Sequence, residues 1–241
     1  MRTGILISVA SLILLGACGG GGGDDSAAVS MSSQNVSVPL QTVVANEATN
    51  GMSASFTVTG TVDNVPVTGS GTLTDAPAVA TTLNGAPVFE TTETVTDTIT
   101  ENGAPPIHES ETTKIFRDPN TFATVSEDRG GLVIDFPPYT IPVSVKPGDG
   151  GVLIIGMLFS DSSRTSQIGT VQISFSVAVN TADSGTVLVT FSETEFDNNN
   201  VQTDKSDRTF KVDAKGNFKH VKDKIKGKHN GHQKDVEEDD D

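Results

Sequence analysis

The chain has 241 residues and carries 31 Asp and Glu against 16 Lys and Arg, a formal net charge of −15 at pH 7. So acidic a chain repels phosphate backbones and anionic headgroups, which excludes nucleic acid and anionic membrane surfaces as electrostatic partners. A single Cys excludes an intramolecular disulfide, so stability has to come from a hydrophobic core. Abundant Thr, Val, Ser and Gly and the absence of Trp favour β-structure over helix.

The first residues have the layout of a secretion signal. Arg2 supplies a short positive segment, residues 5–15 are apolar, and the small residues Gly16 and Ala17 precede Cys18. The apolar run is too short to span a bilayer as a mature helix. We therefore expect residues 1–17 to be removed as a signal peptide.

The residues around that cleavage point, Leu15-Gly16-Ala17-Cys18, resemble the lipobox of bacterial lipoprotein precursors. The resemblance implies that the sulfur of Cys18 takes a diacylglyceryl group and that acyl chains such as palmitate anchor the protein. Two or three chains hold a protein stably on a membrane. In this family an Asp after the cysteine favours the inner membrane, and Gly19 stands there instead, so the resemblance implies the outer membrane. Which face of that membrane the domain occupies is left open.

Residues 18–35 are predicted to be a flexible tether. A run of Gly at 19–23 is followed by acidic and small residues with no apolar period. The cysteine followed by glycines is similar to the mature start of neisserial surface lipoproteins that bind host proteins, such as the transferrin-binding and factor H-binding ones. That similarity implies display at the cell surface.

Residues 36–222 are predicted to form one all-β domain, an antiparallel barrel or sandwich built from successive hairpins. In 53–62, Phe56 and Val58 alternate with Thr, which is the period of a half-buried strand. The break at Asp63-Asn64 predicts a hairpin turn. Glycines within this hairpin favour a curved, barrel-like sheet.

A second hairpin, 86–101 with 106–117, has an unusual composition. One face is a row of Thr, and the other mixes apolar residues with Glu93, Asp97 and Glu101. We expect Glu93 to face Lys114, because opposite charges across a ladder are favourable. Strands of this kind bury little, so the hairpin is expected at an edge or projecting from the body.

The second half of the chain is more apolar. The continuous run 152–159 is typical of a strand buried on both faces. In 168–181 apolar and polar residues alternate, and Phe175 at the centre is predicted to be fully buried. The last residues, 223–241, are rich in charge and poor in apolar side chains, which predicts a disordered tail that is dispensable for folding.

Motifs with known chemistry are absent from the sequence, which has no Gly-x-Ser-x-Gly, His-Glu-x-x-His, phosphate loop or Cys-x-x-Cys. His108 stands alone in the body, and an isolated strand histidine is typical of a surface residue rather than a general base. His229 and His232 supply only two metal ligands. We therefore predict no catalytic residues, no cofactor and no metal site, with lipidation at Cys18.

Two clusters of acidic residues are compatible with binding of a divalent cation, but neither has the pattern of a known cation site. Asp197-Asn198-Asn199-Asn200, with Asp204 and Asp207 beyond, has the composition of a calcium loop but lacks the Gly and Glu of an EF-hand. A plain Asn-rich turn is the simpler interpretation. The second group consists of acids that belong to the long hairpin, where a solvated face is the simpler interpretation: Glu93, Asp97, Glu101, Glu109 and Glu111.

Three functions are compatible with these observations. The first is a lipid-anchored outer-membrane lipoprotein with a non-catalytic β domain that binds a macromolecule, for instance a protein, or has a structural role in the envelope. The second is a carrier of an apolar ligand in a barrel or half-barrel lined by residues such as Ile154, Met157, Ile173 and Phe175. An enzyme is a remote third.

Overall fold

The computed structural model describes residues 35–229 and 232–240. The signal peptide, Cys18 and nearly all of the tether lie outside the described residues. One helix and thirteen strands are described: α1 (Leu40–Asn50), β1 (Met52–Val62), β2 (Val65–Asp75), β3 (Val79–Leu83), β4 (Ala86–Glu101), β5 (Ile107–Arg117), β6 (Thr124–Asp128), β7 (Val133–Asp135), β8 (Gly150–Phe159), β9 (Gln167–Val179), β10 (Thr186–Asp197), β11 (Gln202–Asp213), β12 (Phe218–His229) and β13 (His232–Asp240).

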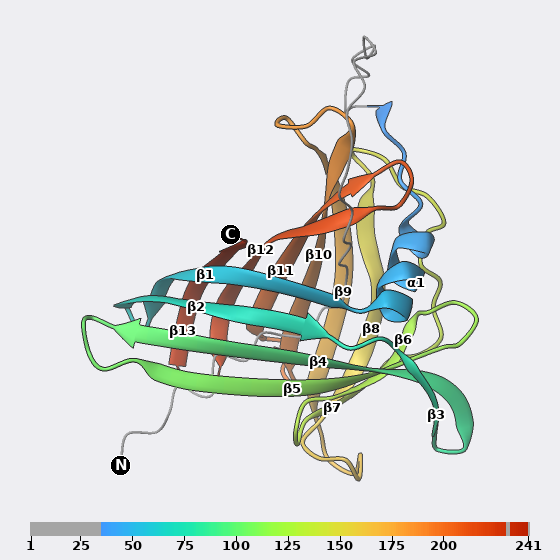
Figure 1. Ribbon diagram of the computed structural model, residues 1–241. Helices are drawn as coiled ribbons and strands as arrows, with labels where there is room; N and C mark the ends of the chain where they lie inside the picture. The colour runs from blue at the N-terminus through green and yellow to red at the C-terminus, as the bar shows by residue number, and fades with distance from the viewer. Residues whose placement is uncertain (1–34, 230–231, 241) are drawn as a thin grey trace.

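The strands form one antiparallel barrel. Successive strands pair along the chain, β2 pairs with β4, and β1 pairs with β13, which closes a circuit of twelve strands with β3 beside it on β4. In Figure 1, β1, β2, β4 and β5 run across the front, and β8 to β12 run steeply behind them. The predicted all-β domain of successive hairpins is confirmed, as a barrel rather than a sandwich.

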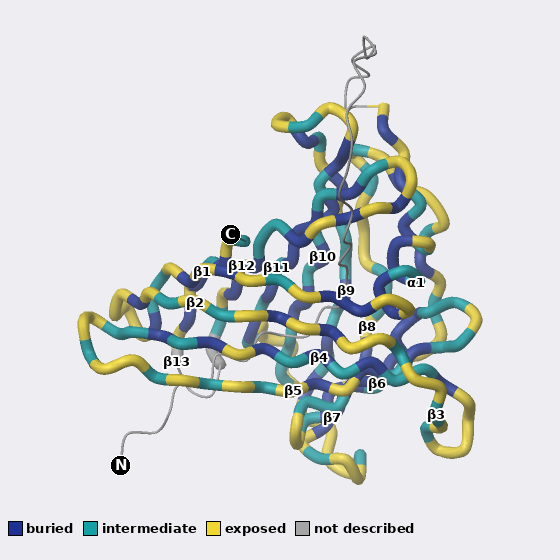
Figure 2. Tube along the Cα trace, in the orientation of Figure 1, coloured by how far each residue is buried: buried dark blue, intermediate teal, exposed yellow. Residues whose placement is uncertain are grey.

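Buried and exposed residues alternate along most of the strands (Figure 2), which separates an inner face of the barrel from an outer one. Thr and Ser dominate outside on β1, β2 and β4. Inside, a smaller apolar cluster joins β1, β2, β4, β12 and β13 around Phe56 and Leu73. The ring of Phe56 lies over Gly71, where any side chain would collide with it, so this position requires a glycine for close packing.

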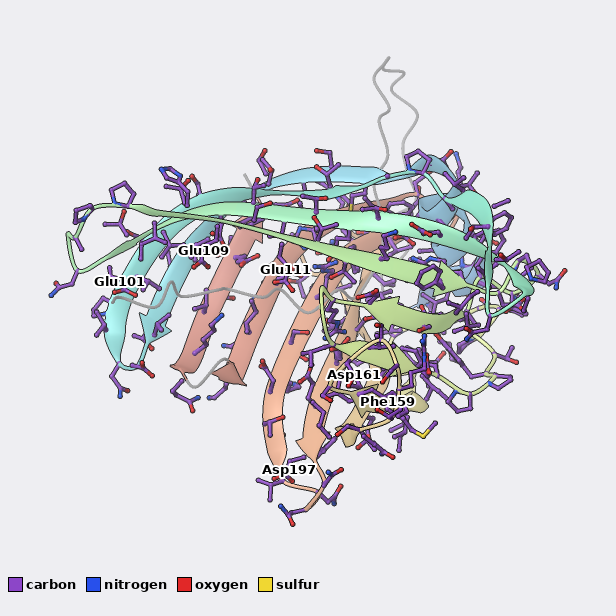
Figure 3. All side chains as sticks on the ribbon, turned by 90° about the horizontal axis from the view of Figure 1, so that it is seen from below. Glu101, Glu109, Glu111, Phe159, Asp161 and Asp197 are labelled. Carbon is purple, nitrogen blue, oxygen red and sulfur yellow. The ribbon has the colours of Figure 1, made fainter. Side chains whose placement is uncertain are left out.

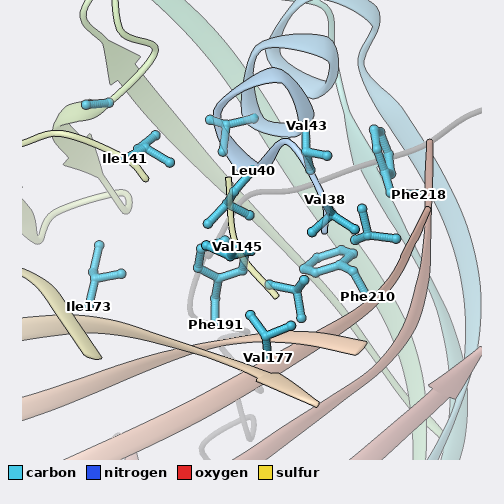
Figure 4. Close-up of a cluster of buried hydrophobic side chains, with 14 of the residues drawn as sticks. Val38, Leu40, Val43, Ile141, Val145, Ile173, Val177, Phe191, Phe210 and Phe218 are labelled. Carbon is cyan, nitrogen blue, oxygen red and sulfur yellow. The ribbon is translucent and has the colours of Figure 1, made fainter. Parts of the chain in front are cut away.

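A larger apolar cluster fills the other part of the barrel around α1 and the segment before β8 (Figure 4). Leu40, Val43, Val44 and Glu47 fall on one face of α1 at helical spacing, and all four are buried. The sequence analysis did not predict this helix, because β-branched residues give it low intrinsic propensity and packing against the barrel stabilises it instead. No helix in the described part is long and apolar enough to cross a membrane.

The hairpin of β4 and β5 does not project, because both strands belong to the barrel wall. Its register differs by one residue from the expected one, since Lys114 lies opposite Thr92 and Glu93 lies opposite Thr113. Residues directly opposite each other in a ladder lie on the same face of a sheet, so this register places Lys114 on the outer face with Thr92. Glu93 lies on the inner face, which it shares with Val95, and it is 1% exposed, so it does not pair with Lys114.

The apolar run in β8 is not buried on both faces. Its inner residues pack on the larger cluster, but the outward side chains of Val152, Ile155 and Met157 are 56%, 52% and 46% exposed. Phe175 on β9 is half-buried and packs beside the cluster, whereas its partner across the ladder, Phe191, is fully buried. The period-two reading of β9 is right, but the burial predicted for Phe175 is wrong.

The charged C-terminal residues are ordered, contrary to the prediction of a disordered tail. β12 runs on past residue 223, and β13 follows it and pairs with both β12 and β1. Ile225 and Val236 point inward, while Lys222, Lys224 and Lys226 lie opposite Asp239, Glu237 and Asp235 on the outside. Cross-strand pairs of opposite charge and the burial of two apolar side chains therefore order these strands, although the segment contains few apolar residues.

Truncation after Ile225 is expected to abolish the cooperative unfolding transition. It removes the end of β12 and all of β13, so β1 loses its ladder to the closing strand and the smaller cluster loses Val236. Circular dichroism melting of the purified proteins measures this. Lys226→Ala removes an exposed 3.5 Å ion pair with Asp235 and is expected to change the free energy of unfolding by only about 0.5 kcal/mol. A truncated protein melting within about 2 °C of the full chain would contradict the closing role of β13.

Candidate functional site

Between the two apolar clusters the barrel contains buried charged side chains that join its walls. Arg208 on β11 is 2% exposed. Its Nε donates to both carboxylate oxygens of Asp223 on β12 at 3.0 Å, and its Nη1 donates to Glu93 on β4 at 2.9 Å. Asp223 is on the adjacent strand, but Glu93 is on the opposite wall, so this one guanidinium fixes the distance across the barrel.

His220 extends this group to the C-terminal strand. Its Nε2 lies 3.0 Å from Asp223 Oδ1 and its Nδ1 lies 2.6 Å from Asp240 Oδ1. Burial lowers the pKa of His220, but the hydrogen bonds to Asp223 and Asp240 outweigh it and raise the pKa to about 9. The imidazole is therefore charged at neutral pH and donates from both nitrogens, tying β12 to the end of β13.

Two further arginines fix other elements. Arg117 on β5 donates to both oxygens of Glu47 on α1, at 3.1 and 2.9 Å, which attaches the helix to the wall. Arg129, after β6, donates to Glu127 at 2.6 Å, to Glu193 at 2.8 Å and to Glu195 at 3.1 Å. Burial raises the pKa of Glu47 and of Glu193 to about 7 in spite of these cations.

A fourth group of charges lies toward the end of the barrel lined by β4, β5 and β13. Lys234 is 1% exposed, and burial lowers its pKa to about 8 against the opposing effect of nearby acids. Those acids are Asp204, Glu109, Glu111 and Asp97, in decreasing order of effect. Gly227 lies opposite Lys234, and a Cβ there would be 2.6 Å from Asp204 Oδ1, so its missing side chain makes room for Asp204.

Acids outnumber bases among the buried side chains of the described residues. Nine carboxylates are buried, against four Lys and Arg and one His: Glu47, Asp75, Glu93, Asp97, Glu127, Glu193, Asp204, Asp223 and Glu238, with Arg117, Arg129, Arg208, Lys234 and His220. An unpaired buried charge is costly, so the excess is relieved by protonation. Burial raises the pKa of Asp97 to about 7 and that of Glu238 to about 8.

The sequence-predicted site residues are dispersed. His108 lies on the outer wall, where its Nδ1 is 2.8 Å from Thr98 Oγ1. Asp197 caps an Asn-rich turn by accepting from the amides of Asn199 and Val201, so the simpler interpretation of that segment is right. Asp204 points into the barrel and Asp207 out of it, to Ser192 and Lys205, so they do not converge with Asp197. Backbone pairing is described for His229 and His232, but their side chains lie outside the described residues.

The acids of the long hairpin are the functional candidates that sequence reasoning placed on the wrong face. Glu93 and Asp97 are buried inside, and Glu109 and Glu111 lie on the side of β5 that faces the interior (Figure 3). Asp197 lies apart from them at the far end of β10 in the same view. In the described ranges, no three His, Cys, Asp or Glu side chains are arranged to hold a metal ion. The alternation of Glu and Asp with Thr in 93–101 was the available signal, since one face of such a strand has to point inward.

The apolar part of the interior contains a small cavity. This cavity has a volume of about 30 Å³ and is lined by residues of α1, β5, β8, β9 and β10, among them Val44, Arg117, Ile173 and Phe191. Such a space holds a water molecule rather than an acyl chain. Of the residues named as the lining of an apolar carrier, Met157 points outward and Ile154 packs into the cluster.

The outer wall has one distinctive apolar patch. It consists of Val152, Ile155 and Met157 on β8 with Ile168 on β9, whose side chains are between 37% and 56% exposed. The ion pair of Arg164 with Asp135, at 2.6 Å, lies on the outside of the neighbouring strand. We call these four residues the aliphatic patch.

No family model, no curated protein and no solved structure matches this chain.

The free energy of unfolding is expected to be greatest near pH 5 and to fall as the pH rises to 8.5. Glu47, Asp97, Glu193 and Glu238 have folded-state pKa values raised to about 7 or 8, so their contribution is present below the unfolded pKa and is lost as pH rises through the folded one. We expect the melting midpoint to fall by about 5 °C or more over this range. Differential scanning calorimetry at constant ionic strength measures it.

Glu238→Gln isolates one of these groups. The amide replaces the protonated acid, so the variant is expected to melt higher than the parent at pH 8.5 and equally at pH 5. Glu237→Gln on the outer face of β13 is the matched control, because its ion pair with Lys222 lowers the pKa of Glu237 and its loss brings no gain at high pH. Equal pH profiles for the parent and Glu238→Gln would rule out a protonated Glu238.

Proposed function

We propose that this chain is a lipid-anchored outer-membrane lipoprotein whose non-catalytic barrel binds another protein through the aliphatic patch. The observation that carries the proposal is the exposure of four aliphatic side chains together on the wall of an otherwise polar barrel. Contiguous exposed apolar groups rimmed by polar residues mark protein interaction sites, because covering them removes apolar area from water.

The neighbours of the aliphatic patch support a protein partner. Ile155 pairs with Gln172, Met157 with Thr170, and Val152 with Ser174, so uncharged polar side chains of β9 border the aliphatic ones. The polar border supplies hydrogen bonds around an apolar centre, which is the usual anatomy of a protein interface. β9, which carries Ile168, pairs with β8 on one side and β10 on the other, so the patch lies on strands held in the wall of the barrel.

A carrier of an apolar ligand is less well supported. The apolar cluster leaves a cavity of only about 30 Å³, so an acyl chain would have to displace α1. That movement would break the two hydrogen bonds between Glu47 and Arg117 and leave both groups buried without each other. Separating a buried ion pair costs about 3–5 kcal/mol. Binding at the outer wall requires no such rearrangement.

The membrane anchor in this proposal depends on Cys18. Cys18→Ser is expected to abolish acylation and to leave the protein uncleaved or released from the outer-membrane fraction, because the chain contains no other thiol. Intact mass measurement of the membrane-extracted protein and fractionation of cells measure both effects. Ser26→Ala in the tether is the control and should behave as the parent. A Cys18→Ser protein that still fractionates with the outer membrane would refute the anchor.

The partner site is tested by photo-crosslinking in intact cells. A benzophenone amino acid replacing Ile155 is expected to give one discrete adduct, which the additional change Met157→Lys abolishes. The same amino acid at Thr190, on the polar outer face of β10, is the control and should give none. Equal adducts from both positions, or none from position 155, would show that the aliphatic patch is not the binding site.

A further inference from the structure

The barrel wall is incompletely paired along β5. β4 pairs with β5 from Ile107 to Arg117, but β6 pairs only with Lys114 to Arg117 on the other side. Within the described ranges, no strand lies on the second side of residues 107–113. Figure 1 shows β5 along the lower border of the front sheet. The amides and carbonyls that point away from β4 in this segment therefore form a strand edge.

The inner side of this edge is acidic. Glu109 lies directly opposite Asp97 on β4, and Glu111 follows two residues later on the same face. Like charges directly opposite each other destabilise a ladder, and here they are also at the interior of the barrel. Asp97 is 5% exposed, and its Oδ1 has no hydrogen-bond partner. The charged side chains that residues 107–113 turn inward are thus both acidic.

A buried ammonium lies near these acids. Lys234 on β13 interacts electrostatically with four carboxyl groups, those of Asp204, Glu109, Glu111 and Asp97. The presence of Lys234 shows that an alkylammonium fits among them. A metal ion fits less well, because no three ligating side chains of the described chain are suitably arranged around one point.

We propose that residues 107–113 accept an extended segment of another polypeptide, which adds to the edge of β5 as a strand and places Lys or Arg side chains beside Glu109 and Glu111. Added strands gain affinity from main-chain hydrogen bonds and specificity from alternate side chains. The outward residues of the edge, His108, Ser110 and Thr112, select uncharged side chains at the intervening positions. Basic and uncharged residues therefore alternate in the partner.

The occupant is another polypeptide rather than this chain's own tether. Residues 18–35 contain two Asp and neither Lys nor Arg, so they cannot supply the basic side chains. Inward carboxylates also discourage apolar strands from adding to the edge, which protects the barrel from aggregation and leaves it selective for a basic partner. The site is separate from the aliphatic patch, since the two lie on β5 and β8.

The test uses the folded protein and a labelled synthetic peptide of alternating Thr and Lys that matches residues 107–113 in length. Fluorescence anisotropy is expected to show saturable 1:1 binding that weakens as salt increases. The double variant Glu109→Gln with Glu111→Gln is expected to bind about tenfold more weakly. The matched control, Glu90→Gln with Glu237→Gln, removes two outward acids and should bind as the parent.

A second peptide separates strand addition from simple charge attraction. N-methylation of alternate amides keeps every charge but removes the donors that would face β5, and it is expected to abolish binding. Amide hydrogen exchange in residues 107–113 should slow with the parent peptide only. Absence of saturable binding, or equal binding of the methylated peptide, would overturn the proposal. Neither result bears on the crosslink at Ile155, so the partner site proposed above is tested independently.

Discussion

The guanidinium of Arg208 is the contact on which the arrangement of the walls depends. It reaches Asp223 on the neighbouring strand and Glu93 on the opposite one, with all three side chains withdrawn from water. Removing one member would leave a buried charge without its partner, a loss of about 3–5 kcal/mol. A one-residue slip of β4 or β11 would turn Glu93 or Arg208 to the outer face. The triad therefore specifies the register of strands that lie far apart in sequence.

The other buried ion pairs extend the same function to the remaining elements. Glu47 with Arg117 attaches α1 to β5, and Arg129 with Glu193 joins the turn after β6 to β10. Each pair connects segments separated by more than sixty residues. In secreted domains rich in cysteine, disulfides make such long-range connections. This chain has a single cysteine, and charged hydrogen bonds between apolar clusters make them instead.

Period-two alternation was enough to predict the β-class, the hairpins and much of the core. It was not enough for Glu93, because a hairpin with a polar composition suggested exposed strands and a pairing with Lys114. In the structure the face that Glu93 shares with Val95 is inside the barrel, and Lys114 lies outside opposite Thr92. The strand around Lys224 could not be predicted from apolar content, because only Ile225 and Val236 face inward there. Pairs of Lys and acidic residues across the ladder of β12 and β13 supply the other stabilising contacts. The exposure of Ile155 could not be read from an apolar run, because a run does not say whether a second layer covers the strand. The partners of Arg208 likewise come from strands that the sequence does not place side by side.

The pairing of β1 with β13 also constrains when the barrel can form. Phe56 lies opposite Asp240, so the partner of the first strand is made only after all the other strands of the barrel. Contacts between such distant segments form late, and a chain still emerging from a ribosome or a translocation channel has no closing strand available. For the exported lipoprotein proposed above, the barrel would stay open throughout passage across the inner membrane. The order of strands would thus keep the chain competent for translocation and delay closure until β13 has been released.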